Sequence, residues 1–293
     1  MHRWPCRPYP HSPGRQSGVT GQSANSPGRL GADSSAGASA QAEAWAKSPV
    51  STWATESLNF TPDPKQAQIL DSPAHRLILL CTRQFGKSTL AAIKALHFAL
   101  TNPNTLTLLA APVERRAAEW IRLIHSYLRL LNIQPKSDGI HPHSVALPNG
   151  SRIVGLPGVV DNNRGYPAHL LIFEEAAIVP EEMFEVLTGS LAATDGHLWL
   201  ISSAGPQIGF FYDQWHNHEL PWQRFKVTAR DCRRISQEFL DHQQLLIGES
   251  AFRREFLCEF TASGHQIFTR ELIDSISTDE HQPWNGGRPL WPQ

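Results

Sequence analysis

The sequence has few cysteines, and their spacing excludes two common scaffolds. Four cysteines are spread over 293 residues, and no two of them form a CxxC pair. A disulfide framework or a zinc site is therefore not expected, and a reducing cytosol fits this composition. No apolar run reaches about 18 residues, so a membrane-spanning helix is not expected. No apolar stretch follows the first arginines, which argues against a secretory signal.

An excess of positive charge is also absent. Lys and Arg total 26 against 27 for Asp and Glu, which gives a formal net charge of -1. This balance argues against a protein that coats nucleic acid, although it allows a local basic patch. Hydrophobic residues make up 41% of the chain, which is enough to build a buried core.

Composition divides the chain into three parts. Residues 1–55 are rich in Ser, Gly, Pro and Ala, and they are expected to form a disordered tail. Residues 56–275 alternate short apolar runs with helical patterns, so they are expected to form the folded domain. Residues 276–293 contain mainly irregular Pro, Gly and Trp patterns and are expected to form a second tail.

The folded part contains five apolar runs that predict buried strands, and amphipathic stretches that predict helices. The strands are expected at residues 76–81, 105–110, 169–173, 197–201 and 224–228, and the helices at 87–100, 113–131 and 236–256. This alternation is typical of a mostly parallel sheet that is covered by helices on both faces. Asn149 and Gly150 lie between two short runs and predict a small hairpin inserted at the sheet edge.

The segment from Cys81 to Thr89 has the composition of a phosphate-binding loop. Gly86 permits close approach of the backbone, Lys87 supplies a cation, and the Ser88 hydroxyl is a ligand for Mg²⁺. A predicted strand precedes the segment and a predicted helix follows it, as such a loop requires. Cys81 replaces the first glycine of the usual pattern. An ordinary helix start with a solvated lysine is the alternative.

Two adjacent carboxylates, Glu174 and Glu175, follow the third predicted strand. Ligands bind at the C-terminal edge of open parallel sheets, so both side chains are expected at such a site. Glu174 suits a role at Mg²⁺, although Asp is commoner there, and Glu175 suits polarisation of the attacking water. A solvated pair that caps the next helix is the alternative.

The sequence resembles the ATPase half of phage large terminase subunits over about residues 60–275. Their phosphate loop often reads R-Q-x-G-K-[ST], and Arg83 to Ser88 match this form. Gln66 lies in a segment like the family's adenine-contacting glutamine motif. Ser202 and Ser203 resemble the coupling motif, and Arg164 resembles an Arg-Gly element that supplies an arginine finger. Each of these also has a simpler interpretation as a solvated or loop residue.

The resemblance implies the P-loop NTPase fold, a three-layer α/β sandwich, with ATP and Mg²⁺ bound. Catalytic roles are expected for Glu175, Lys87, Arg83 and Arg164, and metal ligation for Ser88 and Glu174. The expected nucleotide-binding residues are Gln66, Arg83, Gln84, Phe85, Gly86, Lys87, Ser88, Thr89, Ser202 and Ser203.

The implied function is ATP-driven translocation of double-stranded DNA into a viral capsid. The resemblance implies DNA, a portal protein and a small terminase subunit as partners, a homo-oligomeric ring as the assembly, and the cytoplasm of an infected or lysogenic bacterium as the location. The sequence has no block of clustered aspartates like that of the family's nuclease, so DNA cleavage is not expected. The alternatives are a truncated prophage remnant without turnover, and another DNA-dependent ATPase or helicase.

Overall fold

The computed structural model describes residues 33–136, 142–158 and 167–262. The chain divides into two units, residues 1–39 and 40–293. Within the first unit only the start of a helix is described. The account below therefore concerns the second unit, which holds the sheet and its covering helices.

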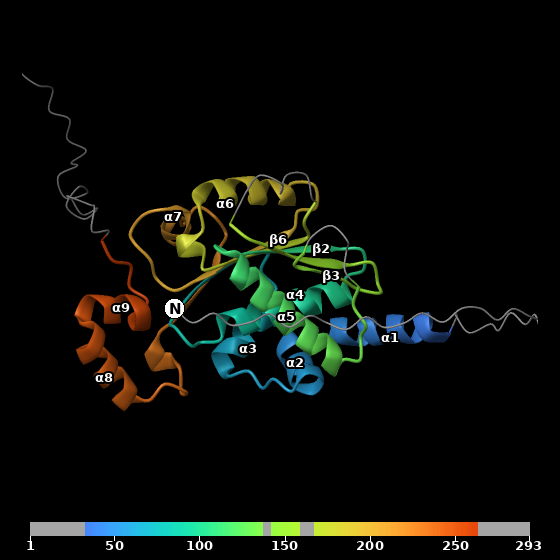
Figure 1. Ribbon diagram of the computed structural model, residues 1–293, viewed down its shortest axis with the longest axis horizontal. Coiled ribbons are helices and arrows are strands. Elements are labelled where there is room, and N and C mark those ends of the chain that lie inside the picture. The colour runs from blue at the N-terminus through green and yellow to red at the C-terminus, as the bar shows by residue number, and fades with distance from the viewer. Residues whose placement is uncertain (1–32, 137–141, 159–166, 263–293) are drawn as a thin grey trace, which may run out of the picture. The chain divides into compact units, whose positions relative to one another are not determined.

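The centre of this unit is a seven-stranded sheet in the order β3-β4-β2-β5-β6-β1-β7 (Figure 1). Its strands are β1 (Arg76–Cys81), β2 (Leu106–Ala110), β3 (Ser144–Ala146), β4 (Arg152–Leu156), β5 (Leu170–Glu174), β6 (His197–Ser202) and β7 (Gln223–Val227). Every neighbouring pair is parallel except β3 and β4, which are antiparallel. The expected mostly parallel sheet is confirmed.

Helices cover both faces of the sheet. The α-helices are α1 (Asp33–Lys47), α2 (Val50–Leu58), α3 (Pro64–Leu70), α4 (Lys87–Thr101), α5 (Glu114–Leu130), α6 (Glu181–Thr188), α7 (Phe210–His216), α8 (Gln237–Ile247) and α9 (Glu249–Leu257). Short 3-10 turns lie at Ala176–Ile178, Gly189–Leu191 and Ala229–Asp231. Figure 1 shows α2 to α5 on one side of the sheet and α6 and α7 on the other.

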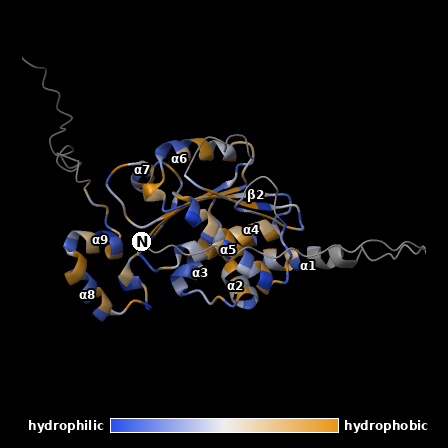
Figure 2. Ribbon diagram, in the orientation of Figure 1, coloured by the Kyte–Doolittle hydropathy of each residue, from blue (hydrophilic) through white to orange (hydrophobic). Residues whose placement is uncertain are grey.

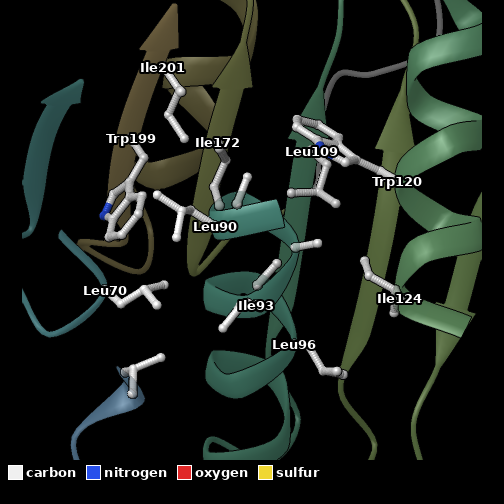
Figure 3. Packing of buried hydrophobic residues seen from close by; sticks show 14 of the residues in the cluster. Leu70, Leu90, Ile93, Leu96, Leu109, Trp120, Ile124, Ile172, Trp199 and Ile201 are labelled. Atoms are coloured by element: carbon white, nitrogen blue, oxygen red, sulfur yellow. The ribbon is translucent and has the colours of Figure 1, made fainter. Parts of the chain in front are cut away.

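Alternate residues of each strand enter opposite cores because successive strand side chains point to opposite faces. In β1, Leu77 and Leu79 pack with α2 to α5, whereas Ile78 and Leu80 pack with α6 and α7. Figure 3 shows Leu90 and Ile93 of α4 near Ile172 and Trp199 of the strands. The strands are accordingly hydrophobic along most of their length, while the outer helices carry both hydrophobic and hydrophilic residues (Figure 2). This double burial explains why the strand sequences are continuous apolar runs.

The hairpin expected at Asn149 and Gly150 is present, and it forms one edge of the sheet. Gly150 has a φ of 84°, a left-handed conformation that favours glycine. The Asn149 side chain donates to the Ala99 carbonyl at the end of α4, at 2.8 Å. The hairpin strands β3 and β4 both join the sheet, because β4 pairs with β3 on one side and in parallel with β2 on the other.

The expected single helix over residues 236–256 is instead two helices. Gly248 separates α8 from α9 with a φ of 79°, which a continuous helix cannot contain. The break lets Phe252 and Phe256 pack with Leu240 in a small separate core. Leu245 is 86% exposed, so it is not one of the buried residues of this core.

The expectation of a disordered tail over residues 1–55 is wrong at its C-terminal end. Helix α2 begins within that range, at Val50, and its residue Trp53 is only 1% exposed. Its ring lies 6.0 Å from the Trp45 ring and 4.9 Å from the His97 ring. Ser and Ala do not prevent a helix, and these aromatic contacts supply the burial that composition did not reveal. Residues 1–32 and the expected tail at 276–293 lie outside the described residues.

No helix in the described part of the chain is long and apolar enough to cross a membrane.

Replacement of Trp53 by alanine tests the role of α2 in the core. We expect the free energy of unfolding to fall by about 3–5 kcal/mol, because the change removes a large buried ring. Denaturant titration measures this loss, and Thr52→Ala on the exposed face of the same helix is the control. Equal stability of the two variants would contradict the packing of α2 into the core.

His97 predicts a pH dependence of stability. Burial lowers its pKa from 6.5 to about 4, although a contact with the Trp45 carbonyl at 3.2 Å acts in the opposite direction. The unfolded chain therefore binds a proton at His97 below about pH 6.5, whereas the folded chain binds it only below about pH 4. The free energy of unfolding is therefore highest above about pH 6.5, and it decreases as the pH falls from about 6.5 to about 4. We expect His97→Gln to flatten the slope of unfolding free energy against pH between 6.5 and 4, and an unchanged slope would contradict this assignment.

Candidate functional site

A cavity of about 860 Å³ lies at the C-terminal ends of β1, β5 and β6. These strands are neighbours in the sheet and parallel, so the residues that follow them meet at one edge. The predicted site residues that line this cavity are Arg83, Gln84, Gly86, Lys87, Ser88, Thr89, Glu175, Ser202 and Ser203.

The loop between β1 and α4 turns sharply through left-handed backbone. Gln84 has a φ of 62° and Gly86 a φ of 96°. Helix α4 begins directly after the second of these, at Lys87, and Gly86 is its N-cap. An α-helix leaves its first N–H groups without helical partners, and its dipole favours an anion at that end. The loop therefore presents the geometry of an anion-binding helix start.

Gln66 holds this loop in place through a buried hydrogen bond. It is 2% exposed, and its Nε2 donates to the Phe85 carbonyl at 2.7 Å. Its Oε1 accepts from the Asp63 backbone N–H at 3.0 Å, which completes the capping box of α3. Arg234 also donates to the Phe85 carbonyl, at 2.9 Å. The side-chain amide of Gln66 thus holds the loop and does not line the cavity.

Lys87 is a buried cation whose ammonium group lies among oxygen atoms. Its side chain is 9% exposed, and Nζ donates to Ser203 Oγ at 2.8 Å. Oε1 of Glu175 lies 3.9 Å from the same nitrogen. These contacts join the end of β5, the end of β6 and the start of α4 in one small volume.

Glu174 is the most buried carboxylate at the site, with 1% exposure. Burial raises its pKa, while the hydrogen bond from the Ser88 hydroxyl and the charges of Arg116 and Lys87 act against that rise. Glu175 beside it is half-buried and has a left-handed φ of 51°. A non-glycine residue in this conformation costs roughly 1 kcal/mol or more, and such strain is concentrated at functional sites.

The remaining predicted residues lie in different places. Ser202 is buried and its Oγ accepts from the Ala177 backbone N–H at 3.2 Å, so it also fixes the turn after Glu175. The Phe85 ring is 1% exposed and belongs to the core, and only its carbonyl serves the loop. Arg164 lies outside the described residues.

Three charged residues line the cavity that the sequence motifs did not single out: Arg116, Arg254 and Glu255. The Glu255 carboxylate is paired with Arg83 and also contacts Arg254 at 3.2 Å. The Glu255 backbone carbonyl accepts from Arg83 N–H at 3.3 Å and from Thr82 Oγ1 at 3.2 Å. Helix α9 is therefore bonded directly to the phosphate loop. The sequence could have indicated Arg116, because it follows the end of β2 and residues after parallel strands lie at the ligand-binding edge of a sheet.

This fold and this loop define a P-loop α/β protein. A family model described as "Terminase large subunit, T4likevirus-type, N-terminal" matches residues 78–275. The chain belongs to this family, as the motifs at the phosphate loop had indicated.

Solved structures share the fold. The ATPase domain of the Thermus phage P74-26 large terminase matches with a TM-score of 0.62 and 22% identity, over 70% of this chain and 96% of that one. A large terminase from a thermophilic bacteriophage, in complex with ADP, matches with a TM-score of 0.57 and 15% identity, over 68% of this chain and 53% of that one. No curated protein matched the chain.

Gln66→Ala tests the support of the loop. The variant removes a buried donor and a buried acceptor, and we expect the free energy of unfolding to fall by about 1–3 kcal/mol without any ligand present. Gln68→Ala is the matched control, because Gln68 is exposed on the same helix. If Gln66 acted only on adenine, the two variants would unfold at the same denaturant concentration, and only discrimination between adenine and guanine nucleotides would change.

Proposed function

We propose that this chain is the ATP-hydrolysing part of a large-terminase motor that drives double-stranded DNA into a viral capsid. The observation that carries the proposal is that Lys87, Glu175 and Ser203 meet beside the P-loop, where Nζ of Lys87 lies 2.8 Å from Ser203 Oγ and 3.9 Å from Glu175 Oε1. Family membership supports the same function. The large terminase of the thermophilic bacteriophage, which shares the fold, has been solved with ADP and with ATP-gamma-S.

In this proposal the triphosphate of ATP binds at the start of α4. The first N–H groups of the helix and the ammonium group of Lys87 neutralise its charge. Arg83 adds a second cation from the loop, and Gln84 and Thr89 line the same cavity. The arrangement suits the substrate because an anion gains most from donors already held in place. Gln66 is proposed to reach adenine only if its present bonds to the loop are exchanged.

Ser88 and Glu174 have the chemistry to hold Mg²⁺. Both offer only oxygen donors, which this cation prefers, and a carboxylate as buried as Glu174 is stabilised by a cation. The hydrogen bond between them brings the two donors together. A bound Mg²⁺ would neutralise charge on the phosphate oxygens. The Glu side chain at this position replaces the commoner Asp and remains compatible with the role.

Glu175 is proposed to orient and polarise the attacking water. Its carboxylate is half-buried at the cavity and lies beside the cation that would hold the phosphates. If the Lys87 ammonium group left Ser203 to bind a phosphate, the Ser203 hydroxyl would lose this hydrogen bond and could contact the terminal phosphate. Ser202 and Ser203 are proposed to sense that phosphate. Arg164 is proposed to stabilise the charge of the transition state, on its own ATP or on that of a neighbouring copy.

The wider assignments rest on the family. Double-stranded DNA, a portal protein and a small terminase subunit are the proposed partners, with a ring of copies as the proposed assembly and the bacterial host cytoplasm as the location. We also propose that the ATPase domain begins near residue 40, because the second unit starts there and α2 is part of its core.

Phosphate release from ATP with Mg²⁺, measured with and without double-stranded DNA, tests the proposed function. We expect DNA to stimulate turnover, and Glu175→Gln to reduce it by about 10²–10⁴-fold while ATP still binds. Glu182→Gln is the control, because Glu182 is exposed on α6. Binding of ATP without turnover by the wild type would favour the remnant alternative, and strand separation would favour a helicase.

A further inference from the structure

Four cations line the phosphate cavity: Arg83, Lys87, Arg116 and Arg254. Three of them already have close partners. Glu255 is paired with Arg83 and Arg254, and Lys87 donates to Ser203. Among the described residues, the carboxylate found for Arg116 is Glu119, one turn along its own helix, at 4.0 Å. Lys87 lies at a similar distance from a carboxylate, 3.9 Å from Glu175, but it also has its hydrogen bond to Ser203. Among the described residues, Arg116 is therefore the cation at this cavity whose side chain has the fewest close partners.

The fold brings Arg116 to this place. Strand β2 pairs in parallel with β5, and Ala110 at its end lies opposite Phe173, the residue before Glu174. The chain then turns through Pro112 and Val113, both at the cavity, and Arg116 lies in the first turn of α5. Arg116 thus reaches the cavity from the side of β2, whereas Lys87 reaches it from the side of β1.

The exposure and the shape of the Arg116 side chain agree with this placement. The side chain is 45% exposed, so it keeps the freedom to move onto a ligand. A guanidinium offers donors in a planar fork that matches the oxygens of a phosphate.

We propose that Arg116 binds the terminal phosphate of ATP in the same chain and is a further catalytic residue of the site. It would contact oxygens that are absent from ADP, so it would distinguish the triphosphate from the diphosphate. Loss of the terminal phosphate would release α5 from the site and so connect hydrolysis to this helix. The inference rests on the proposed ATPase function.

The test compares Arg116→Ala with Arg115→Ala. Arg115 is the neighbouring arginine on the same helix, is 85% exposed and pairs with Glu119 at 3.0 Å, so it is a matched control. We measure binding of ATP-gamma-S and of ADP, each with Mg²⁺. We expect Arg116→Ala to weaken ATP-gamma-S by about tenfold to a hundredfold and to change ADP by less than about threefold. Arg115→Ala should change neither.

Further variants keep the result interpretable. Arg116→Lys keeps the charge but not the fork, and we expect partial recovery of ATP-gamma-S binding. Thermal unfolding confirms that each variant is folded. Equal losses of ATP-gamma-S and ADP, or no loss of either, would overturn the role of Arg116.

Lys87→Ala separates this inference from the proposed function. If the wild type binds nucleotide and Lys87→Ala does not, a wild-type result for Arg116→Ala overturns only the role of Arg116. If the wild type binds neither nucleotide, both proposals fail.

Discussion

The parallel pairing of β1 with β6, and of β6 with β5, is the constraint on which the site depends. Because these strands run in the same direction, the residues after each of them emerge at one edge of the sheet. Lys87, Glu175 and Ser203 come from three segments far apart in the sequence and still meet within hydrogen-bond or ion-pair distance. The buried apolar faces hold the strands in register and thereby hold these polar groups.

Charge balance at this edge explains why the polar groups are tolerated. Glu174 and Lys87 are both nearly buried, and a buried charge costs several kcal/mol unless it is paired or hydrogen-bonded. Ser88 donates a hydrogen bond to Glu174, while Lys87 donates one to Ser203 and lies close to Glu175. Each partner is also suited to contact a nucleotide or its metal ion. Binding would therefore exchange partners instead of exposing bare charges.

Segments on either side of the P-loop in the sequence fix its conformation. Gln66 comes before β1 and Arg234 comes after β7, and both donate to the Phe85 carbonyl. Glu255 of α9 holds the Arg83 end of the same loop through its side chain and its backbone. A loop with two left-handed residues needs such support, because its conformation is strained without it. The contacts also connect α9 directly to this loop.

The apolar runs determined the strands, because a strand buried on both faces needs consecutive apolar residues. The G-K-S segment determined the phosphate loop, because an anion-binding loop also needs residues that are adjacent in sequence. Local composition also determined the hairpin at Asn149 and Gly150. Composition failed at α2, because whether Trp53 is buried depends on His97 and Trp45, which lie elsewhere in the chain. It also failed at Gly248, where one left-handed residue divides a helix.

Only the tertiary structure decided the electrostatic partners at the site. The bracing role of Gln66, the pairing of Arg83 with Glu255 and the position of Arg116 all depend on distances between segments that no local pattern contains. The sequence determined which chemical groups the site contains, since those groups must follow strands and start a helix. Folding decided which of them meet, because electrostatic and hydrogen-bond interactions act through space and not along the chain.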